Sequence, residues 1–200
     1  MSWPADVTLR GTHVTLEPLA PRHTPGMIEA VRDGELWNLW YTIVPRPEGM
    51  EAEIARRLEL RARGSMQPFA VLDTQGHCVG MTTYMNIDAT HKRVEIGSTW
   101  YAKRVQRSAL NTECKLMLLQ HAFETLECIA VEFRTSFFNH QSRRAIERLG
   151  AKLDGILRSH QRHSNGSLRD TCVYSIIAPE WPAVKGHLAY QLSRKHERHD

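Results

Sequence analysis

Apolar and polar positions follow several distinct periods along the chain, and each change of period predicts a new element. Residues 7–19 alternate every second position around Gly11, which predicts an extended opening segment or a hairpin. Apolar residues then recur at helical spacing in 23–41 and again in 47–64, and Gly64 is placed to end the second helix. The opening of the chain is therefore expected to supply an extended segment and two helices.

The middle of the chain changes to strand periodicity. Three apolar-rich segments, the first two separated by a polar turn at 74–77, predict an antiparallel meander. These segments are 68–73, 78–87 and 93–102. The helical pattern returns from Ser108 or Asn111, with apolar residues at three- and four-residue steps. A long helix is therefore expected directly after the third strand.

The end of the chain combines both patterns. Residues 129–135 predict a strand, and 139–150 predict a short helix with Asn139 as its N-cap and Gly150 just past its end. The remaining predicted elements are a hairpin of 151–160 and 168–177 around a turn at 164–166, and a terminal helix at 178–195. The order is strand, two helices, three strands, helix, strand, helix and two strands, which predicts a mixed α+β sheet.

Composition limits the size and location of the protein. A chain of 200 residues with 42% apolar content is suited to one domain, 1–200, with a substantial core. No window reaches the roughly 18 apolar residues that a membrane span needs, and the start "MSWPADVTLRG" lacks a basic end and an apolar signal core. We therefore expect a cytoplasmic protein with no membrane partner.

Cysteine and histidine give no sign of a metal site. The cysteines stand singly, with no CxxC pair and no cluster at metal-ligand spacing, so buried free thiols are expected. They are Cys78, Cys114, Cys128 and Cys172. The eleven histidines are dispersed. We expect no metal.

A net charge of +4 and a pI near 9.0 allow attraction to anions, yet Lys and Arg are spread along the chain. This distribution fits a phosphate-bearing cofactor as well as nucleic acid. We expect no direct nucleic-acid partner. A nucleic-acid binder is an alternative suggested only by the pI, and its retention on heparin would vanish at modest salt.

The segment "AKRVQRSALN" leads directly into the long helix. A helix start carries unpaired N–H groups and the positive end of the dipole, so small residues there let a phosphate approach closely. Ser108 and Ala109 are small, while Lys103, Arg104 and Arg107 add charge that can neutralise a diphosphate. The alternative is an ordinary basic turn with a Ser or Asn cap.

Four segments together resemble one known family. "LRGTHVTLEPL", "VEIGSTWYAKRVQRSALN", "NHQSRRAIERLGAKLDGILRSH" and "RDTCVYSI" are similar, in that order, to the GNAT superfamily of N-acetyltransferases. Within it they look most like the RimJ/RimL type of ribosomal-protein N-terminal acetyltransferase. The most specific part is "N..S..AIERLGA" followed by "G.LR", and the resemblance covers nearly the whole chain.

The resemblance implies a fold in which two central strands splay apart and admit the pantetheine arm of acetyl-CoA. In the family, the loop after the third meander strand wraps the pyrophosphate in a pattern of Gln or Arg, two variable residues, Gly, any residue, and Gly or Ala. Gln106 matches the first position, whereas Ala109 and Asn111 replace the two small positions. Ala109 is compatible with a negative φ, and a positive φ there would be strained.

Cofactor contacts follow from this resemblance. The backbone of Ser98, Thr99 and Trp100 is expected to bind the pantetheine and polarise the thioester carbonyl. Asn139 and Ser142 match the asparagine that bonds the pantetheine and the serine that protonates the thiolate, although both also suit a helix N-cap. The loop residues expected to hold the pyrophosphate are Arg104, Gln106, Arg107, Ser108, Ala109, Leu110 and Asn111.

Acetyl transfer to an amine also needs a base. With reference pKa values of about 7.8 for an α-amine and about 10.4 for lysine, an N-terminal amine can manage with a weak base or a water chain. Glu95 lies where many family members place the base, and strict alternation puts it on one face with Gly97, Thr99 and Tyr101. A solvent-facing carboxylate is the alternative. His160 is the second candidate, or else a structural or exposed histidine.

Side chains near the expected acceptor side allow several interpretations. Trp37, Trp40 and Tyr41 either line a substrate groove or form a core stripe. Tyr174, on the last strand, is expected in the core, with a place on the acceptor side as the alternative. Acidic residues in the first helices could attract a cationic acceptor or only solvate the helices; they are Asp33, Glu35, Glu48, Glu51 and Glu53.

The resulting prediction is an acetyl-CoA-dependent N-acetyltransferase that moves an acetyl group to a primary amine by direct attack in a ternary complex. A protein N-terminus, a polyamine-like metabolite and an amine antibiotic remain open as acceptors, because variable helices and loops build that side. The resemblance also implies a possible homodimer. A non-catalytic acyl-CoA-binding module is the alternative, supported by the altered phosphate loop.

Overall fold

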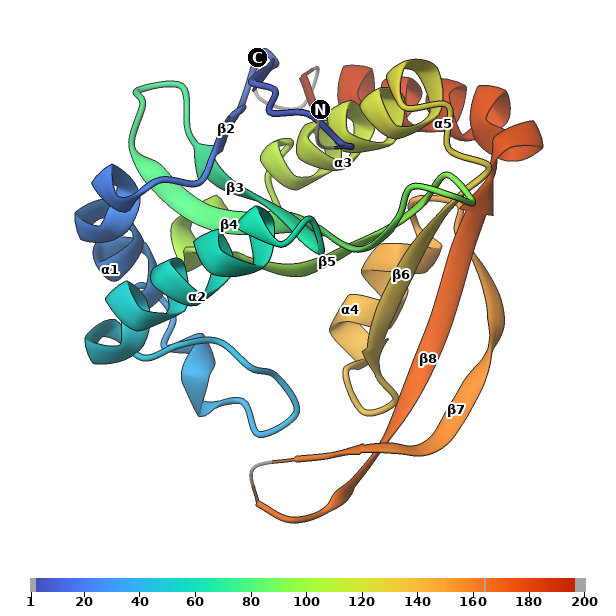
Figure 1. Ribbon diagram of the computed structural model, residues 1–200. Coiled ribbons are helices and arrows are strands. Elements are labelled where there is room, and N and C mark those ends of the chain that lie inside the picture. Colours follow the sequence, from blue (N-terminus) through green and yellow to red (C-terminus); the bar gives the residue numbers. More distant parts are fainter. Residues whose placement is uncertain (1–2, 164, 197–200) are drawn as a thin grey trace.

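The computed structural model describes residues 3–163 and 165–196. Eight strands form one sheet in the order β1-β2-β3-β4-β5-β6-β8-β7 (Figure 1). Neighbouring strands are antiparallel except β5 and β6, which are parallel. The strands are β1 Leu9–Arg10, β2 Thr15–Pro18, β3 Met66–Leu72, β4 Cys78–Asp88, β5 Arg93–Tyr101, β6 Ala130–Ser136, β7 Lys152–Arg162 and β8 Leu168–Ile177. The predicted mixed sheet is confirmed.

Helices cover both faces of the sheet and divide the core in two. Helices α1 and α2 pack on one face of β3 to β5, in a cluster that contains Met27, Met81 and Trp100. The opposite face packs against α3, α4 and α5, in a cluster that contains Leu118 and Leu188. The helices are α1 Thr24–Arg32, α2 Met50–Ala62, α3 Leu110–Gln120, α4 His140–Glu147 and α5 Trp181–His196.

The first predicted helix, 23–41, is wrong in length. Helix α1 ends at Arg32, because Gly34 (φ +103°) and Glu35 (φ +46°) turn the backbone into the left-handed region. A single short 3-10 turn, Leu36–Asn38, follows. The opening hairpin is confirmed by the pairing of β1 with β2, and Gly64 lies just past α2 with φ +76°.

Most later boundaries agree with the sequence. Helix α3 begins at Leu110, between the two starting points that were expected, and continues as a π-helical turn at His121–Thr125. Asn139 caps α4 as predicted, and Gly150 has φ +99°. The meander and the final hairpin are both confirmed by strand pairing. Of the predicted 164–166 turn, residue 164 lies outside the described residues.

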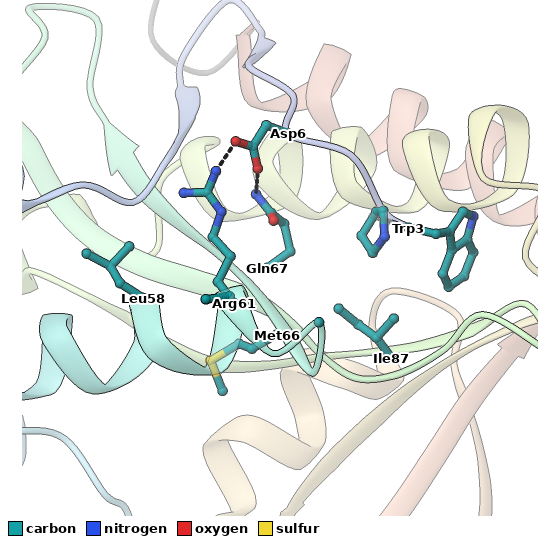
Figure 2. A pocket seen from close by; sticks show the side chains of 10 residues that line it. Trp3, Asp6, Leu58, Arg61, Met66, Gln67 and Ile87 are labelled. Atoms are coloured by element: carbon teal, nitrogen blue, oxygen red, sulfur yellow. Dashed lines mark hydrogen bonds and ion pairs between the residues drawn. The ribbon is translucent and has the colours of Figure 1, made fainter. Parts of the chain in front are cut away.

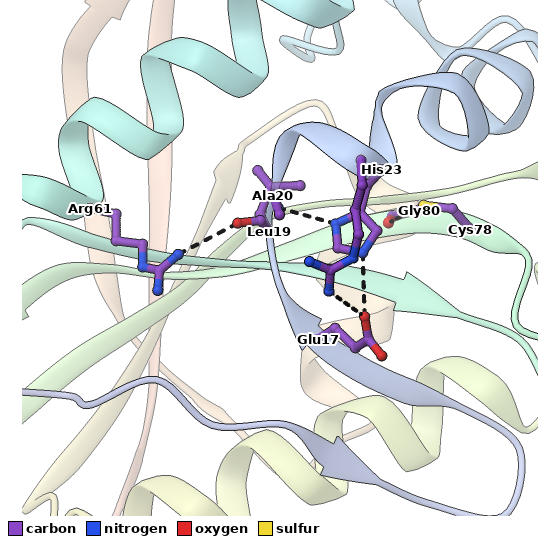
Figure 3. A network of polar contacts seen from close by, with 8 residues as sticks. Glu17, Leu19, Ala20, His23, Arg61, Cys78 and Gly80 are labelled. Atoms are coloured by element: carbon purple, nitrogen blue, oxygen red, sulfur yellow. Dashed lines mark hydrogen bonds and ion pairs between the residues drawn. The ribbon is translucent and has the colours of Figure 1, made fainter.

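The N-terminal segment is tied to α1 and α2 by a polar network (Figure 3). Arg61 pairs with Asp6 and donates to the Leu19 carbonyl at 3.5 Å. His23, 7% exposed, accepts a hydrogen bond from the Ala20 N–H on Nδ1 at 3.1 Å and lies 3.4 Å from a Glu17 oxygen through Nε2. Because Nδ1 accepts, the neutral tautomer with its proton on Nε2 fits this site.

Protonation of His23 is expected to destabilise the fold below its ordinary pKa of 6.5. Burial lowers the pKa of His23, and the neighbouring Arg22 lowers it further. The unfolded chain therefore binds more protons at mildly acid pH, so stability falls as pH drops through 6.5. Urea unfolding on both sides of that value should show a smaller pH dependence in His23→Gln than in wild type. Equal dependence would contradict the assignment.

Candidate active site

Strands β5 and β6 pair at one end only. Arg93, Val94 and Glu95 are opposite Ala130, Val131 and Glu132, and the pairing then stops. Beyond it, β5 continues to pair with β4 and β6 with β8, so the two edges that face each other diverge (Figure 1). Within the described residues, those two edges have no strand partner over 96–101 and 133–136. Backbone N–H and C=O groups along these two edges are available to an extended ligand, although the Tyr101 carbonyl already accepts from Gln106.

A bulge lies on β5 where the strands diverge. Gly97 pairs with Thr83 and Trp100 with Met81, so Ser98 and Thr99 together face the single residue between them on β4. Ser98 is exposed and has φ +47°, a strained conformation for a non-glycine residue. The bulge therefore aims the backbone of Ser98 and Thr99 differently from the rest of the strand.

The bulge overturns the predicted alternation on this strand. Glu95 and Gly97 share the α1/α2 face, since a Cβ on Gly97 would lie 2.8 Å from a Glu95 oxygen. The inserted residue moves Thr99 and Tyr101 to the other face, where Thr99 bonds Lys115 and Tyr101 donates to Cys114, both on α3. Glu95 therefore does not share a face with Thr99 and Tyr101.

Glu95 is a buried carboxylate rather than a solvent-facing one. Its side chain is 5% exposed and accepts a hydrogen bond of 2.6 Å from Asn86 Nδ2, while Arg134 Nε lies 3.6 Å away. Burial raises the pKa of Glu95, and the Asn86 bond and Arg134 only partly oppose this rise. A carboxylate with a raised pKa is better matched to accept a proton near neutral pH.

The loop between β5 and α3 is held by its own side chains. After a 3-10 turn at Lys103–Val105, Gln106 Nε2 donates to the Tyr101 carbonyl at 2.9 Å. Ser108 Oγ donates to the Val105 carbonyl at 2.7 Å and accepts from the Leu110 N–H at 3.3 Å. Ala109 has φ −66°, so its methyl group costs no backbone strain, and the positive φ of +64° falls at Arg107 instead.

The start of α3 has the features of an anion site. The first bond of the helix runs from the Glu113 N–H to the Ala109 carbonyl, so earlier N–H groups have no intrahelical acceptor. Thr112 Oγ1 and Asn111 Oδ1 are buried and have no hydrogen-bond partner among the described residues. The hydroxyl can donate to an anion, whereas the amide oxygen only accepts and does not favour one. Lys103 and Arg107 are exposed beside them, whereas Arg104 lies 3.6 Å from Asp73. A phosphate-bearing ligand fits this helix start.

Helix α4 begins across the divergence. Asn139 Oδ1 accepts a 3.0 Å bond from the Ser142 N–H, which leaves the amide NH₂ of Asn139 available to a ligand. The Ser142 hydroxyl has no partner within the part of the chain that the structure describes. Tyr174 is fully buried between Arg143 and Glu147 of this helix, as predicted for a core residue.

His160 is not brought together with Glu95. It is exposed on β7, the outermost strand, and β8 and β6 separate it from β5. Its Nδ1 lies 3.1 Å from Thr171 Oγ1 of the neighbouring strand. We find no geometric reason to give it the same role as Glu95.

An aromatic cluster that sequence analysis did not assemble joins three distant segments. The Trp40 ring lies 5.5 Å from Phe138 and 5.0 Å from His163, measured between centroids. Trp40 is 47% exposed, whereas Trp37 packs against the α1/α2 core, so the core stripe holds for Trp37 only. Phe138 and His163 carry no periodic signal that would connect them to Trp40.

One pocket lies away from these residues. It has a volume of about 450 Å³ and is bounded by the N-terminal segment, the end of α2 and the ends of β3 and β4 (Figure 2). Asp6 projects into it, but its carboxylate is already satisfied by Arg61 and Gln67. No group of three or more His, Cys, Asp or Glu in the described ranges could hold a metal ion. None of the described helices is long and apolar enough to cross a membrane.

The sheet thus opens between two parallel strands, beside a basic helix start. The model of the acetyltransferase (GNAT) domain family matches residues 13–152. A protein from T. thermophilus described as an acetyltransferase is 33% identical, with a TM-score of 0.82 over 95% of this chain and 99% of its own. The chain belongs to the acetyltransferase (GNAT) family, as the sequence predicted.

Further solved structures share this fold. A GCN5-related N-acetyltransferase from Brucella melitensis is 29% identical, with a TM-score of 0.82 over 94% of this chain and 86% of its own. Mycobacterium smegmatis RimJ, solved in complex with a CoA-disulfide, is 20% identical, with a TM-score of 0.77 over 94% of this chain and 95% of its own. A search of curated protein sequences found no match.

Proposed function

We propose that this acetyltransferase moves an acetyl group from acetyl-CoA to a primary amine by direct attack in a ternary complex. The observation that carries the proposal is the divergence of β5 and β6 beside the start of α3. It offers two free strand edges to the pantetheine arm and a helix start to the diphosphate. The family membership supports the same donor.

The expected contacts with acetyl-CoA follow from this placement. The loop from Arg104 to Asn111 binds the diphosphate through its backbone and the exposed Arg107, and Ala109 requires no positive φ to do so. The N–H groups at the bulge polarise the thioester carbonyl. The free amide of Asn139 bonds the pantetheine, and the Ser142 hydroxyl supplies a proton to the departing thiolate.

Glu95 is the proposed base. It receives the proton of the attacking amine, directly or through water, on the α1/α2 face of the sheet. Its buried carboxylate is more readily protonated than an exposed one, and an α-amine with a reference pKa of about 7.8 needs only such a weak base. His160 is separated from β5 by two strands, β6 and β8, and is the weaker candidate.

Unpaired donors on the same face favour an acceptor that carries carbonyl oxygens. Trp100 Nε1, Ser136 Oγ and Arg169 Nε are buried and have no hydrogen-bond partner among the described residues. Trp100 packs in the α1/α2 cluster, and alternation from the core residues Phe133 and Cys172 puts Ser136 and Arg169 on that face too. Because all three can donate, a peptide N-terminus fits better than a polyamine.

Three of the five acidic residues that could attract a cationic acceptor, Asp33, Glu35 and Glu53, already have hydrogen-bond partners within the chain. Glu53 is bound by Arg56 and Arg57, and Asp33 accepts the backbone N–H of Arg104. These carboxylates therefore have partners within the chain. The acceptor that we propose is the free α-amine of a peptide or protein.

Acetyl-CoA is expected to raise the melting temperature of the protein. A ligand at 100 times its Kd stabilises a fold by about 2.7 kcal/mol, which a thermal-shift titration detects. CoA release should then be faster with a short peptide than with a polyamine, and absent with the same peptide N-acetylated. Binding without release for any amine would favour the non-catalytic alternative, and no shift would contradict the proposal.

Asn139→Asp tests the proposed contact between Asn139 and acetyl-CoA while keeping the helix cap. Aspartate caps a helix as well as asparagine, so α4 keeps its bond from the Ser142 N–H. The variant loses the amide NH₂ and should weaken acetyl-CoA binding by about tenfold, in line with one lost hydrogen bond to a polar group. Unchanged binding would remove Asn139 from the site.

A further inference from the structure

Lys115 is a buried lysine beneath the bulge. It lies on α3, is 7% exposed, and its Nζ donates to Thr99 Oγ1 at 2.9 Å and to Thr82 Oγ1 at 3.3 Å. The two hydroxyl oxygens lie 2.8 Å apart, so the ammonium group and both hydroxyls are hydrogen-bonded to one another. Thr99 is a residue of the bulge itself, which connects Lys115 to the backbone whose N–H groups face the proposed thioester.

No carboxylate neutralises this ammonium group. None of the described acidic residues forms an ion pair with Lys115, and Glu113 on the same helix is occupied by the N–H groups of Thr12 and His13, at 2.8 and 2.6 Å. An unpaired buried ammonium is costly. Burial lowers the pKa of Lys115 from its ordinary value of 10.5, and no described carboxylate opposes this shift.

The titratable groups around Lys115 are neutral. Burial raises the pKa of Cys114 on the same helix, of Tyr101 on β5 and of Tyr84 on β4. Burial also lowers the pKa of His121, one helical segment further along. None of these groups carries charge near neutral pH, so an anion that stabilises the protonated form of Lys115 has to come from outside the described residues.

We propose that Lys115 is a positioning residue with two effects. Its hydrogen bond to Thr99 holds the bulge in place, and its ammonium group stabilises the negative charge that develops near the bulge during acetyl transfer. The inference rests on the proposed function. The amine nitrogen bonds to the carbonyl carbon, whose oxygen becomes negative. The C–S bond then breaks, the sulfur leaves with its electron pair and takes up a proton, and the amine proton passes to Glu95. Both anionic species form next to the bulge.

This arrangement explains why lysine occupies a core position. A methionine would fill the same space without desolvating a charge, so the ammonium group adds nothing to packing. Charge fixed in a site of low dielectric stabilises a developing anion without reorganisation when the reaction occurs. The bond to Thr99 fixes the direction of that charge relative to the bulge.

The test titrates the thiol of CoA bound to wild type and to Lys115→Met, following the ultraviolet absorbance of the thiolate. In wild type the pKa of the bound thiol should lie below that in Lys115→Met, because the ammonium favours the thiolate. Lys115→Met should also lower kcat by about 10- to 100-fold while KM for acetyl-CoA changes by less than about threefold. An identical thiol pKa in both proteins would overturn the proposal.

Thr99→Val tests the hydrogen bond between Lys115 and the bulge separately from the charge of Lys115. This variant keeps the ammonium and removes its bond to the bulge, so the thiol pKa should stay close to wild type while kcat falls. A pKa that shifts as far in Thr99→Val as in Lys115→Met would show a general disturbance and overturn the role of the charge. If wild type binds no CoA, the proposed function itself fails, which is a different outcome from equal thiol pKa values.

Discussion

Glu95→Gln is expected to lower kcat/KM for the acceptor amine by about 100- to 1,000-fold, the range that a positioned general base contributes. The glutamine keeps the shape of the side chain and can still accept the hydrogen bond from Asn86. It cannot take a proton. The loss should be greatest near neutral pH and smaller in alkaline solution, where more of the amine is already neutral. Initial rates of CoA release across a pH series measure this.

The stability of Glu95→Gln shows whether its loss of activity comes from the missing base or from unfolding. Burial raises the pKa of Glu95 above its ordinary value of 4.5, so the unfolded chain loses this proton first as pH rises. The ionised carboxylate therefore opposes folding above that pH, and Glu95→Gln should be at least as stable as wild type at neutral pH. A variant that is inactive because it has unfolded would contradict this account.

Glu132→Gln is the matched control. Glu132 stands directly opposite Glu95 on β6, is more exposed and pairs with Arg134, and its charge is only a minor cause of the raised pKa of Glu95. Loss of activity in Glu132→Gln should stay within about threefold, because a partly exposed ion pair contributes little. Equal losses in the two variants would mean that charge on this face, and not proton transfer by Glu95, controls the rate.

Periodicity predicted the elements well because most of them bury one face. The meander, the β7–β8 hairpin and α4 all follow patterns that tertiary packing preserves. The error in 23–41 arose because "DGELWNLW" keeps helical spacing while Gly34 and Glu35 leave the helical region of φ and ψ. Apolar spacing does not report a backbone turn, although the glycine was a signal that could have located it.

The candidate site was less accessible to sequence reasoning. The bulge at Ser98 depends on how β5 pairs with β4, and one inserted residue was enough to move Thr99 and Tyr101 to the other face. Burial of Lys115 could not be predicted, because a lysine on a helix is normally exposed. The N-cap role of Asn139 was predictable, since capping depends on residues adjacent in the sequence.

Gly80→Ala is expected to destabilise the protein by about 3 kcal/mol, the largest effect on stability among the substitutions considered. A Cβ at Gly80 would lie 2.3 Å from the Trp100 carbonyl oxygen and 3.0 Å from Tyr101 Cα, both backbone atoms of the paired strand. Neither atom can move without separating β4 from β5. Urea unfolding followed by circular dichroism gives the change in free energy.

Gly155→Ala shows what the same substitution does where space is free. Gly155 also lies in a strand, and a Cβ there meets no atom within 4 Å. Alanine should stabilise this position by about 0.5 kcal/mol, because it restricts the unfolded chain more than glycine does. Since Trp100 follows the bulge directly, Gly80→Ala should also lower acetyl-CoA affinity in the fraction that remains folded, whereas Gly155→Ala should not. Equal stability of the two variants would mean that β4 and β5 can separate at Gly80 at little cost, and the bulge would then be too loosely held to direct its N–H groups at a thioester.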